Sequence, residues 1–179
     1  MGMSEYDWPI EFRKIYDAAT KRYQGGERTP QKLFSKGQLE FLASIGCSAQ
    51  ELFDFMDDLA RYDEPTFETV LLTTGVRRDY FRLVQNGVPS AKQIDMDALP
   101  AKKEKVDGIE WLPRLIEKAR AKLRGEMPPD LMYGCGGDRP FLREMNVELS
   151  EFLRLVWTSG DDNRRIVDYV KKRRAQPSA

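Results

Sequence analysis

The sequence predicts an all-α fold made of two tandem helical repeats, and three observations support this prediction. Laid over itself with a shift of one hundred residues, the chain matches without a gap from Trp8–Val70 to Gly108–Val170. Apolar positions coincide along this alignment, as expected of repeats that keep the same burial. Those positions recur at helical spacing, and segments typical of strands are almost absent. The identical pairs are Ala19/Ala119, Gly25/Gly125, Gly37/Gly137, Phe41/Phe141, Leu42/Leu142, Glu51/Glu151 and Val70/Val170.

The first helix of the first repeat has a signal at each end. Asp7 is the expected N-cap, and Pro9 fits the first turn. Gly25, which is followed by a second glycine, is expected to end the helix with left-handed backbone angles. The apolar residues between these ends fall on one helical face: Phe12, Ile15, Tyr16, Ala19 and Tyr23.

Three further helices are expected in this repeat. A short one covers about Gln38–Ser44. Ser48 and Glu51 form the sequence of a capping box, which opens the third helix. The fourth begins near Pro65 and is expected to reach Asn86-Gly87, where the glycine ends it.

The second repeat has the same order of elements, and its first helix is expected to end with left-handed angles at Gly125. We assign the repeats to residues 7–87 and 108–174, with a linker at 88–107. Each repeat alone buries little apolar surface, so we expect three or four helices from each to pack about an approximate twofold, as two domains or one compact domain. The expected helices of the second repeat are Ile109–Leu123, Asp138–Glu144, Leu149–Trp157 and a C-terminal helix that begins after Asp162 and ends at Arg174.

Composition excludes several classes of function. The formal net charge is zero, which gives no general attraction to nucleic acid or to anionic membranes. No apolar run approaches the roughly 20 residues that cross a bilayer, and the first residues do not have the pattern of a secretory signal. We therefore expect a cytoplasmic protein without a membrane or DNA partner.

The chain contains no histidine and only two cysteines, Cys47 and Cys135. Catalytic triads that contain histidine are therefore excluded within one chain, and no metal site is expected because the commonest metal ligand is absent. The two cysteines lie at non-equivalent positions of the repeats and do not form a C-x-x-C pair. No motif identifies a cofactor.

The loop Met132–Arg139 contains three glycines around Cys135 and leads into a helix that begins at Asp138. Glycine permits positive φ and close backbone approach. Amides at a helix start, together with the charge of Arg139, stabilise a thiolate or an anionic ligand. Cys135 and Asp138 are therefore the candidate catalytic residues. The candidate ligand-binding residues of this loop are Tyr133, Cys135, Gly136, Gly137, Asp138 and Arg139.

The corresponding loop of the first repeat has Ser35 in place of the thiol and Gln38 in place of the acid. Such asymmetry is expected of one working copy and one structural copy. The alternative is that the second loop is structural as well. Asp138 is then only an N-cap, the glycines only form a turn, and Cys135 is a small buried apolar residue.

Arg78 and Tyr80, late in the fourth helix, are two further candidate ligand-binding residues. Arg78 could neutralise an anion or bind Asp138, and Tyr80 supplies a phenol. The alternative is an ion pair within a solvated helix. A helix-turn-helix is disfavoured because the helix after Ser48 carries acids that would repel phosphates.

Three segments of the second repeat resemble a bacterial family, the domain-of-unknown-function family numbered 5069. They carry a leading W-x-P-R, a K-A-R-A-K-L-x-G helix, a C-x-x-D loop and a closing E-F-L helix. The resemblance covers about Gly108–Val170 and implies a small helical bacterial cytosolic protein, but it supplies no catalytic residues. Cys135 and Asp138 fit the C-x-x-D pattern, and Ser35 and Gln38 depart from it. The segments are Trp111–Gly125, Tyr133–Leu142 and Glu151–Val156.

From these patterns we expect a site for a small anionic or thiol-reactive ligand at the Cys135 loop, between the repeats. One alternative is a non-catalytic helical module that binds a protein partner. The other is a cysteine-dependent enzyme whose base, without histidine, is Asp138 or Tyr80.

Overall fold

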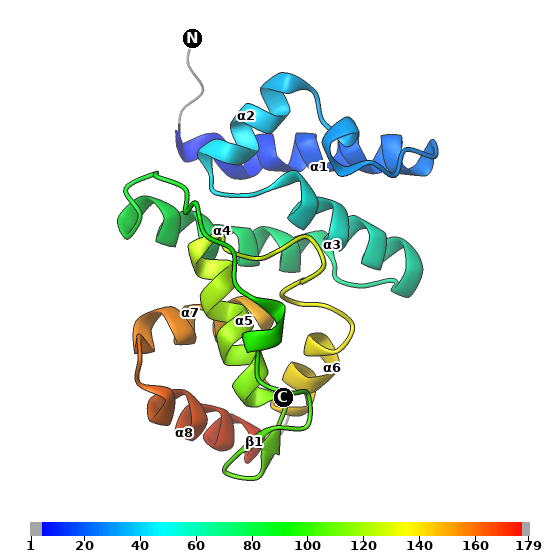
Figure 1. Cartoon of the computed structure of the whole chain (residues 1–179). Helices are drawn as coiled ribbons and strands as arrows, with labels where there is room; N and C mark the ends of the chain where they lie inside the picture. The colour runs from blue at the N-terminus through cyan, green and yellow to red at the C-terminus, as the bar shows by residue number, and fades with distance from the viewer. Residues whose placement is uncertain (1–4, 177–179) are drawn as a thin grey trace. The chain divides into compact units, whose positions relative to one another are not determined.

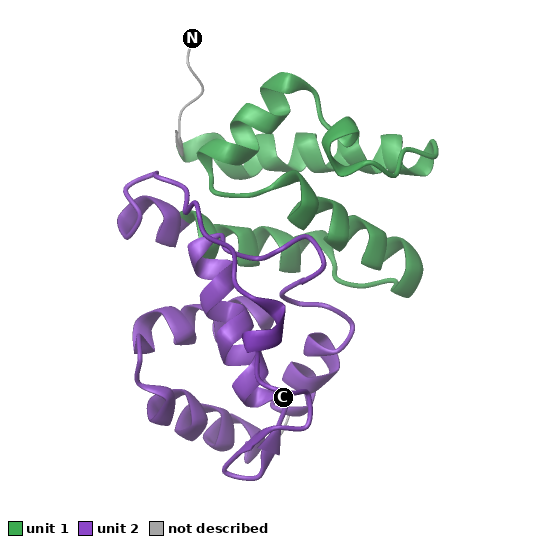
Figure 2. Ribbon diagram, in the orientation of Figure 1, with its two compact units in different colours: residues 1–78 green, residues 79–179 purple. Residues whose placement is uncertain are grey.

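The computed structural model describes residues 5–176 and confirms an all-α protein (Figure 1). The chain divides into two compact units, residues 1–78 and 79–179 (Figure 2). No helix among the described residues is long and apolar enough to cross a membrane.

Unit 1 is built from helices that bury one apolar stripe each. The long helix α1 packs against α3 and against the 3₁₀ turn η2. Phe12, Ile15, Leu33 and Leu52 are almost completely buried in the core of this unit. The elements are η1 (Glu5–Asp7), α1 (Trp8–Gln24), η2 (Pro30–Leu33), α2 (Lys36–Ser44), α3 (Ala49–Tyr62) and α4 (Phe67–Leu83), whose last turn belongs to unit 2.

The helix ends of unit 1 agree with the sequence at α3 and differ at α1. The capping box of Ser48 and Glu51 is present at the start of α3. Asp7 precedes α1, but its side chain makes no capping hydrogen bond. The left-handed angles predicted for Gly25 are wrong: its φ is −74°, and Gly26 has positive φ instead. The amide of Gly25 still donates a helical hydrogen bond to the carbonyl oxygen of Lys21. The helix therefore includes Gly25 in its hydrogen bonding, and the left-handed position falls on the next residue.

Unit 2 is organised around α5, which packs against α7, and α7 in turn packs against α8. Its core contains the fully buried side chains of Leu112, Leu115, Phe152 and Leu153. Gly125 ends α5 with φ 70°, as predicted. The elements are η3 (Met96–Ala98), β1 (Lys105–Val106), β2 (Ile109–Glu110), α5 (Leu112–Arg124), α6 (Asp138–Glu144), α7 (Leu149–Ser159) and α8 (Asn163–Arg174).

The small antiparallel ladder of β1 and β2 was not expected from the sequence. Lys105 pairs with Glu110, and Val106 pairs with Ile109. Asp107 and Gly108 form the turn with φ of 49° and 77°, the combination that two-residue hairpins favour. Strands of two residues are too short to give an alternating pattern, so only the Asp-Gly pair could have indicated them.

The helices of both units follow the same order at a shift close to one hundred residues. For example, α2 and α6 end at Ser44 and Glu144, and α3 and α7 begin at Ala49 and Leu149. The start of the second repeat differs, because the β2 strand precedes α5 and the 3₁₀ turn η1 precedes α1. The common helix order is what the alignment predicts. Duplication and a twofold arrangement stay predictions.

Candidate functional site

The glycine-rich loop lies between α5 and α6 and surrounds a buried carboxylate. Asp138, the first residue of α6, is fully buried. Its Oδ1 accepts a hydrogen bond of 2.9 Å from Trp111 Nε1, and its Oδ2 accepts one of 2.8 Å from the amide of Gly134. The Nζ of Lys118 lies 2.5 Å from Oδ2. Asp138 therefore does more than open a helix, since α6 has Gly137 at its N-cap position and no side-chain capping bond.

Lys118 connects this carboxylate to the thiol. Its side chain is 3% exposed, and its Nζ lies 3.3 Å from the Sγ of Cys135. Burial of an ammonium group is costly unless it is paired and hydrogen-bonded, and Asp138 supplies that pairing. The result is a chain of contacts from Trp111 through Asp138 and Lys118 to Cys135, which we call the buried Lys–Asp–Cys cluster.

Cys135 itself is partly exposed and carries a free thiol. The sequence predicted that amides at the start of the following helix would face this sulfur. The amides of Asp138 and Arg139 instead donate to the carbonyl oxygen of Cys135, at 2.9 and 3.1 Å. The ammonium of Lys118 is therefore the positive group that contacts the sulfur.

Two glycines of the loop are required by close packing. Gly134 has φ +85°, and a Cβ there would lie 2.5 Å from a methyl carbon of Leu149. A Cβ on Gly137 would lie 2.6 Å from the ring of Trp111. Gly136 differs, because a Cβ there would meet nothing closer than 4.0 Å. The loop thus needs glycine where it touches α7 and the indole.

Tyr133 and Arg139 hold the loop from its two ends. The phenol of Tyr133 is buried and donates a hydrogen bond of 2.8 Å to the carbonyl of Leu149. Burial and the nearby charge of Asp138 raise the pKa of Tyr133 well above 10, so this phenol stays protonated. Arg139 is 8% exposed, and its Nη1 donates to the carbonyl of Gly134 at 2.6 Å.

The remaining two candidates lie outside the loop. Arg78 belongs to unit 1, where its guanidinium lies 5.2 Å from the ring centroid of Trp8. Tyr80 belongs to unit 2 and packs edge-on against Trp157, with ring centroids 5.6 Å apart. The structure thus gathers the six loop candidates and gives Arg78 and Tyr80 aromatic contacts of their own.

Sequence reasoning missed Lys118 and the role of the Trp111 indole. The signal for Lys118 was present, because it stands three residues after Leu115 and beside Ala119, on the apolar face of α5. A charged residue on such a face requires a buried partner. The indole of Trp111 gave no comparable signal, since its partner is 27 residues away.

The positions one hundred residues upstream of the cluster carry none of its groups. Trp111, Lys118, Cys135 and Asp138 correspond there to Glu11, Ala18, Ser35 and Gln38. In unit 1, Ser35 and Gln38 form the capping box of α2, and Gln38 Oε1 also accepts a hydrogen bond of 3.4 Å from Arg22 Nη1 of α1. All four members of the cluster are therefore changed together in the first repeat.

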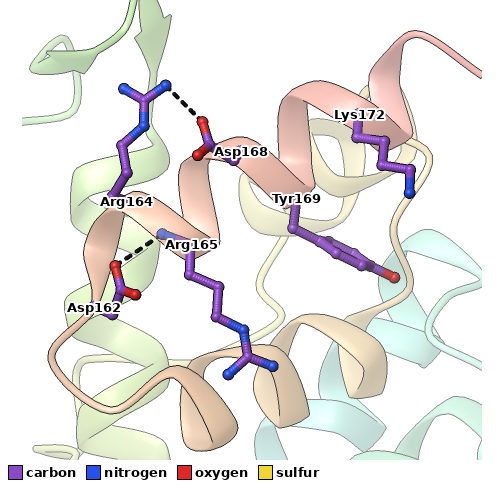
Figure 3. A pocket seen from close by; sticks show the side chains of 6 residues that line it. All are labelled: Asp162, Arg164, Arg165, Asp168, Tyr169 and Lys172. Atoms are coloured by element: carbon purple, nitrogen blue, oxygen red, sulfur yellow. Dashed lines mark hydrogen bonds and ion pairs between the residues drawn. The ribbon is translucent and has the colours of Figure 1, made fainter.

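Unit 2 also has an open hollow of about 450 Å³ along α8 (Figure 3). Several of its charged groups bond within the protein. Arg164 pairs with Asp168 at 2.6 Å, and Arg165 Nη1 donates to the carbonyl of Thr158 at 2.7 Å. The first of these bonds lies within α8, and the second joins α8 to the end of α7. The lining residues are Asp162, Arg164, Arg165, Asp168, Tyr169 and Lys172.

Within residues 5–176, the structure has no group of three or more histidine, cysteine, aspartate or glutamate side chains that could hold a metal ion. The buried Lys–Asp–Cys cluster offers one carboxylate and one thiol, and its cation is already the lysine.

Comparison with known proteins bears on unit 2. No curated protein and no solved structure matches the chain. Residues 97–179, just under half of the chain, match the family model described as a domain of unknown function (DUF5069). The match supports the resemblance of the second repeat to this family over the segment that contains the Cys135 loop, and it does not include the first 96 residues.

Proposed function

We propose that the Cys135 loop is a reactive-thiol site that takes up a small thiol-reactive or anionic molecule. The observation that carries the proposal is the 3.3 Å contact between Lys118 Nζ and Cys135 Sγ, in which a buried cation faces a partly exposed thiol. A thiolate, and not a thiol, is the nucleophile, and a neighbouring cation favours the thiolate form.

The surrounding bonds support this role because they fix the cation in place. Asp138 holds Lys118, and the indole of Trp111 and the amide of Gly134 share the charge of that carboxylate. Because Asp138 also accepts these two other hydrogen bonds, its carboxylate neutralises the ammonium of Lys118 only in part. The remaining positive charge acts on the sulfur of Cys135. A cation in contact with sulfur stabilises the negative charge of a thiolate nucleophile.

In this proposal the two repeats arose by duplication, and the first copy kept the helices but lost the site. The support is the shared helix order together with the joint replacement of the four cluster positions by Glu11, Ala18, Ser35 and Gln38. The site would then lie in unit 2 alone. The ligand would be small, since Tyr133, Asp138 and Arg139, which lie near Cys135 in the loop, are buried.

Alkylation by iodoacetamide tests the proposal on the unmodified protein, with Cys47 as the internal control. Cys47 is 6% exposed, and its Sγ donates to the carbonyl oxygen of Ser48 at 3.6 Å. We expect iodoacetamide to modify Cys135 faster than Cys47 at pH 7, because a buried cation contacts the sulfur of Cys135.

The variant Lys118→Met should slow the alkylation of Cys135, and Lys122→Met, on the same helix and similarly buried, is the matched control. Circular dichroism of each variant establishes that it folds. Alkylation of Cys135 no faster than that of Cys47 in the unmodified protein would reject the reactive-thiol site, whatever the variants do. Native mass spectrometry of the purified protein and of Cys135→Ser would identify a bound small molecule.

A further inference from the structure

We propose that a peroxide converts the contact between Cys135 and Lys118 into a covalent nitrogen–sulfur bond. The proposal rests on the reactive thiol proposed above and adds a modification site that involves a second residue. Its basis is that three groups needed for the reaction touch one another. Cys135 is partly exposed, the amine nitrogen lies 3.3 Å from its sulfur, and a carboxylate oxygen lies 2.5 Å from that nitrogen.

In the first step the Cys135 thiol reacts with hydrogen peroxide. The sulfur attacks one oxygen, the O–O bond breaks, and a sulfenic acid and one water form. The sulfur is oxidised by two electrons and the peroxide is reduced by two. Only a small oxidant is required, and Cys135 is the more exposed of the two cysteines. Sulfenic acids condense with thiols or with nitrogen atoms.

In the second step the nitrogen of Lys118 is the partner. The only other thiol of the chain, Cys47, is 6% exposed, whereas Lys118 Nζ already contacts the sulfur. The ammonium gives one proton to Asp138 Oδ2, and the free electron pair of the amine forms the N–S bond. The S–O bond breaks, and the hydroxide takes the second nitrogen proton and leaves as water. Asp138 is thus the base of the step.

The cross-link would change the site because it removes both of its reactive groups. The thiolate is lost, and the nitrogen of Lys118 no longer carries a positive charge. Asp138 keeps the proton that it accepted and its bonds from Trp111 and Gly134. Peroxide would therefore block the reaction of Cys135 with other reagents. A dithiol that reduces the N–S bond would regenerate the free thiol.

The test uses the full chain, treated with hydrogen peroxide and digested with trypsin. We expect one product that joins the peptides of Lys118 and Cys135, with a mass two hydrogen atoms below their sum, and its loss after treatment with dithiothreitol. Oxidised protein should resist iodoacetamide at Cys135 until it is reduced. Lys118→Arg should give no such product, while Lys122→Arg should give it as the unmodified chain does.

Three outcomes would overturn the cross-link. The first is dimedone trapping of a Cys135 sulfenic acid with no joined peptide. The second is a loss of two hydrogens within the Cys135 peptide alone, which would mean a bond to a backbone amide. The third is a disulfide dimer. If Cys135 is alkylated rapidly and any of these outcomes is found, the proposal of a reactive thiol is kept and only the link to Lys118 is rejected. Alkylation of Cys135 no faster than that of Cys47 rejects the thiol site itself.

Discussion

Trp111 and Asp138 are 27 residues apart, and the indole Nε1 of one donates a hydrogen bond of 2.9 Å to the carboxylate of the other. This bond joins the residue that precedes α5 to the first residue of α6. Trp111 has φ 69°, a left-handed angle that is uncommon for a large side chain. The indole therefore holds its own backbone in that conformation while it positions the carboxylate that holds Lys118.

The first prediction concerns the ion pair of Lys118 and Asp138. Replacing one partner leaves a buried charge without its counterion, so Lys118→Met and Asp138→Leu should each lower the free energy of unfolding by about 3–5 kcal/mol. The double variant should lose clearly less than the sum of the two, because neither charge is then left alone. Urea unfolding followed by circular dichroism measures all three.

The pair of Lys105 and Glu110 is the matched control. Its charged atoms are 3.0 Å apart, but both side chains are 55% exposed. Glu110→Gln should therefore change the free energy of unfolding by less than about 1 kcal/mol. Additive losses in the Lys118 and Asp138 variants would show that the two residues are not coupled.

A second prediction distinguishes two neighbouring glycines. Gly137→Ala places a Cβ within 2.6 Å of the Trp111 ring, so the indole must move and its bond to Asp138 is lost. We expect a loss of about 1–3 kcal/mol, typical of overpacking. Gly136→Ala has open space and should change stability by less than about 0.5 kcal/mol. Thermal unfolding compares them, and equal midpoints would contradict the close packing of the indole.

The position of the helices could be predicted from the sequence, because their signals are local. Ser48 and Glu51 are three residues apart and cap α3 as expected. The left-handed glycine after α1 shows the limit of such signals. Gly25 and Gly26 are adjacent, and the final hydrogen bonds of the helix, to Lys21 and Tyr23, determine which one takes positive φ.

The chemistry of the loop could be predicted only in part. Cys135 and Asp138 stand out because of the glycines around them, but the partners of Asp138 come from α5 and from the residue before it, 20 and 27 positions earlier. A local pattern suggests an N-cap for an acid at a helix start. Only the fold shows that this acid binds an indole and a lysine, so that a lysine, and not helix amides, contacts the thiol.

A third prediction uses two tyrosines of α1. Tyr16 is 4% exposed, and within the described residues no hydrogen-bond partner reaches its phenolic oxygen. Tyr16→Phe removes a buried oxygen without a partner, so stability at neutral pH should be unchanged or rise by about 1 kcal/mol. Tyr23 donates a 2.6 Å hydrogen bond to Asp57, and Tyr23→Phe should cost about 1–2 kcal/mol. The midpoints of urea unfolding show whether each substitution raises or lowers stability.

Alkaline pH gives a second measurement on Tyr16. Burial raises the pKa of this phenol from 10.0 to about 12. A raised pKa in the folded protein means stability that is present below pH 10 and is lost as the pH rises toward 12. Tyr16→Phe should therefore unfold less readily than the unmodified chain across this range. Parallel stability curves for the two proteins between pH 9 and 12 would show that Tyr16 is solvated.

The last prediction concerns Glu126, which fastens the segment before α5 to the end of that helix. Burial raises the pKa of Glu126, but hydrogen bonds from Arg124 Nε at 2.6 Å and Ser90 Oγ at 2.8 Å outweigh it, so the pKa lies below 4.5. A lowered pKa in the folded state contributes stability above pH 4.5 that is lost as the pH falls through the folded value. Glu126→Gln should lower stability at pH 7 by about 1 kcal/mol and flatten its decline below pH 4.5. Ser90→Ala removes one donor and should produce a smaller change in the same direction. Urea midpoints between pH 3 and 7 measure both, and an acid profile that is unchanged in Glu126→Gln would show that this carboxylate does not contribute to the loss of stability in acid.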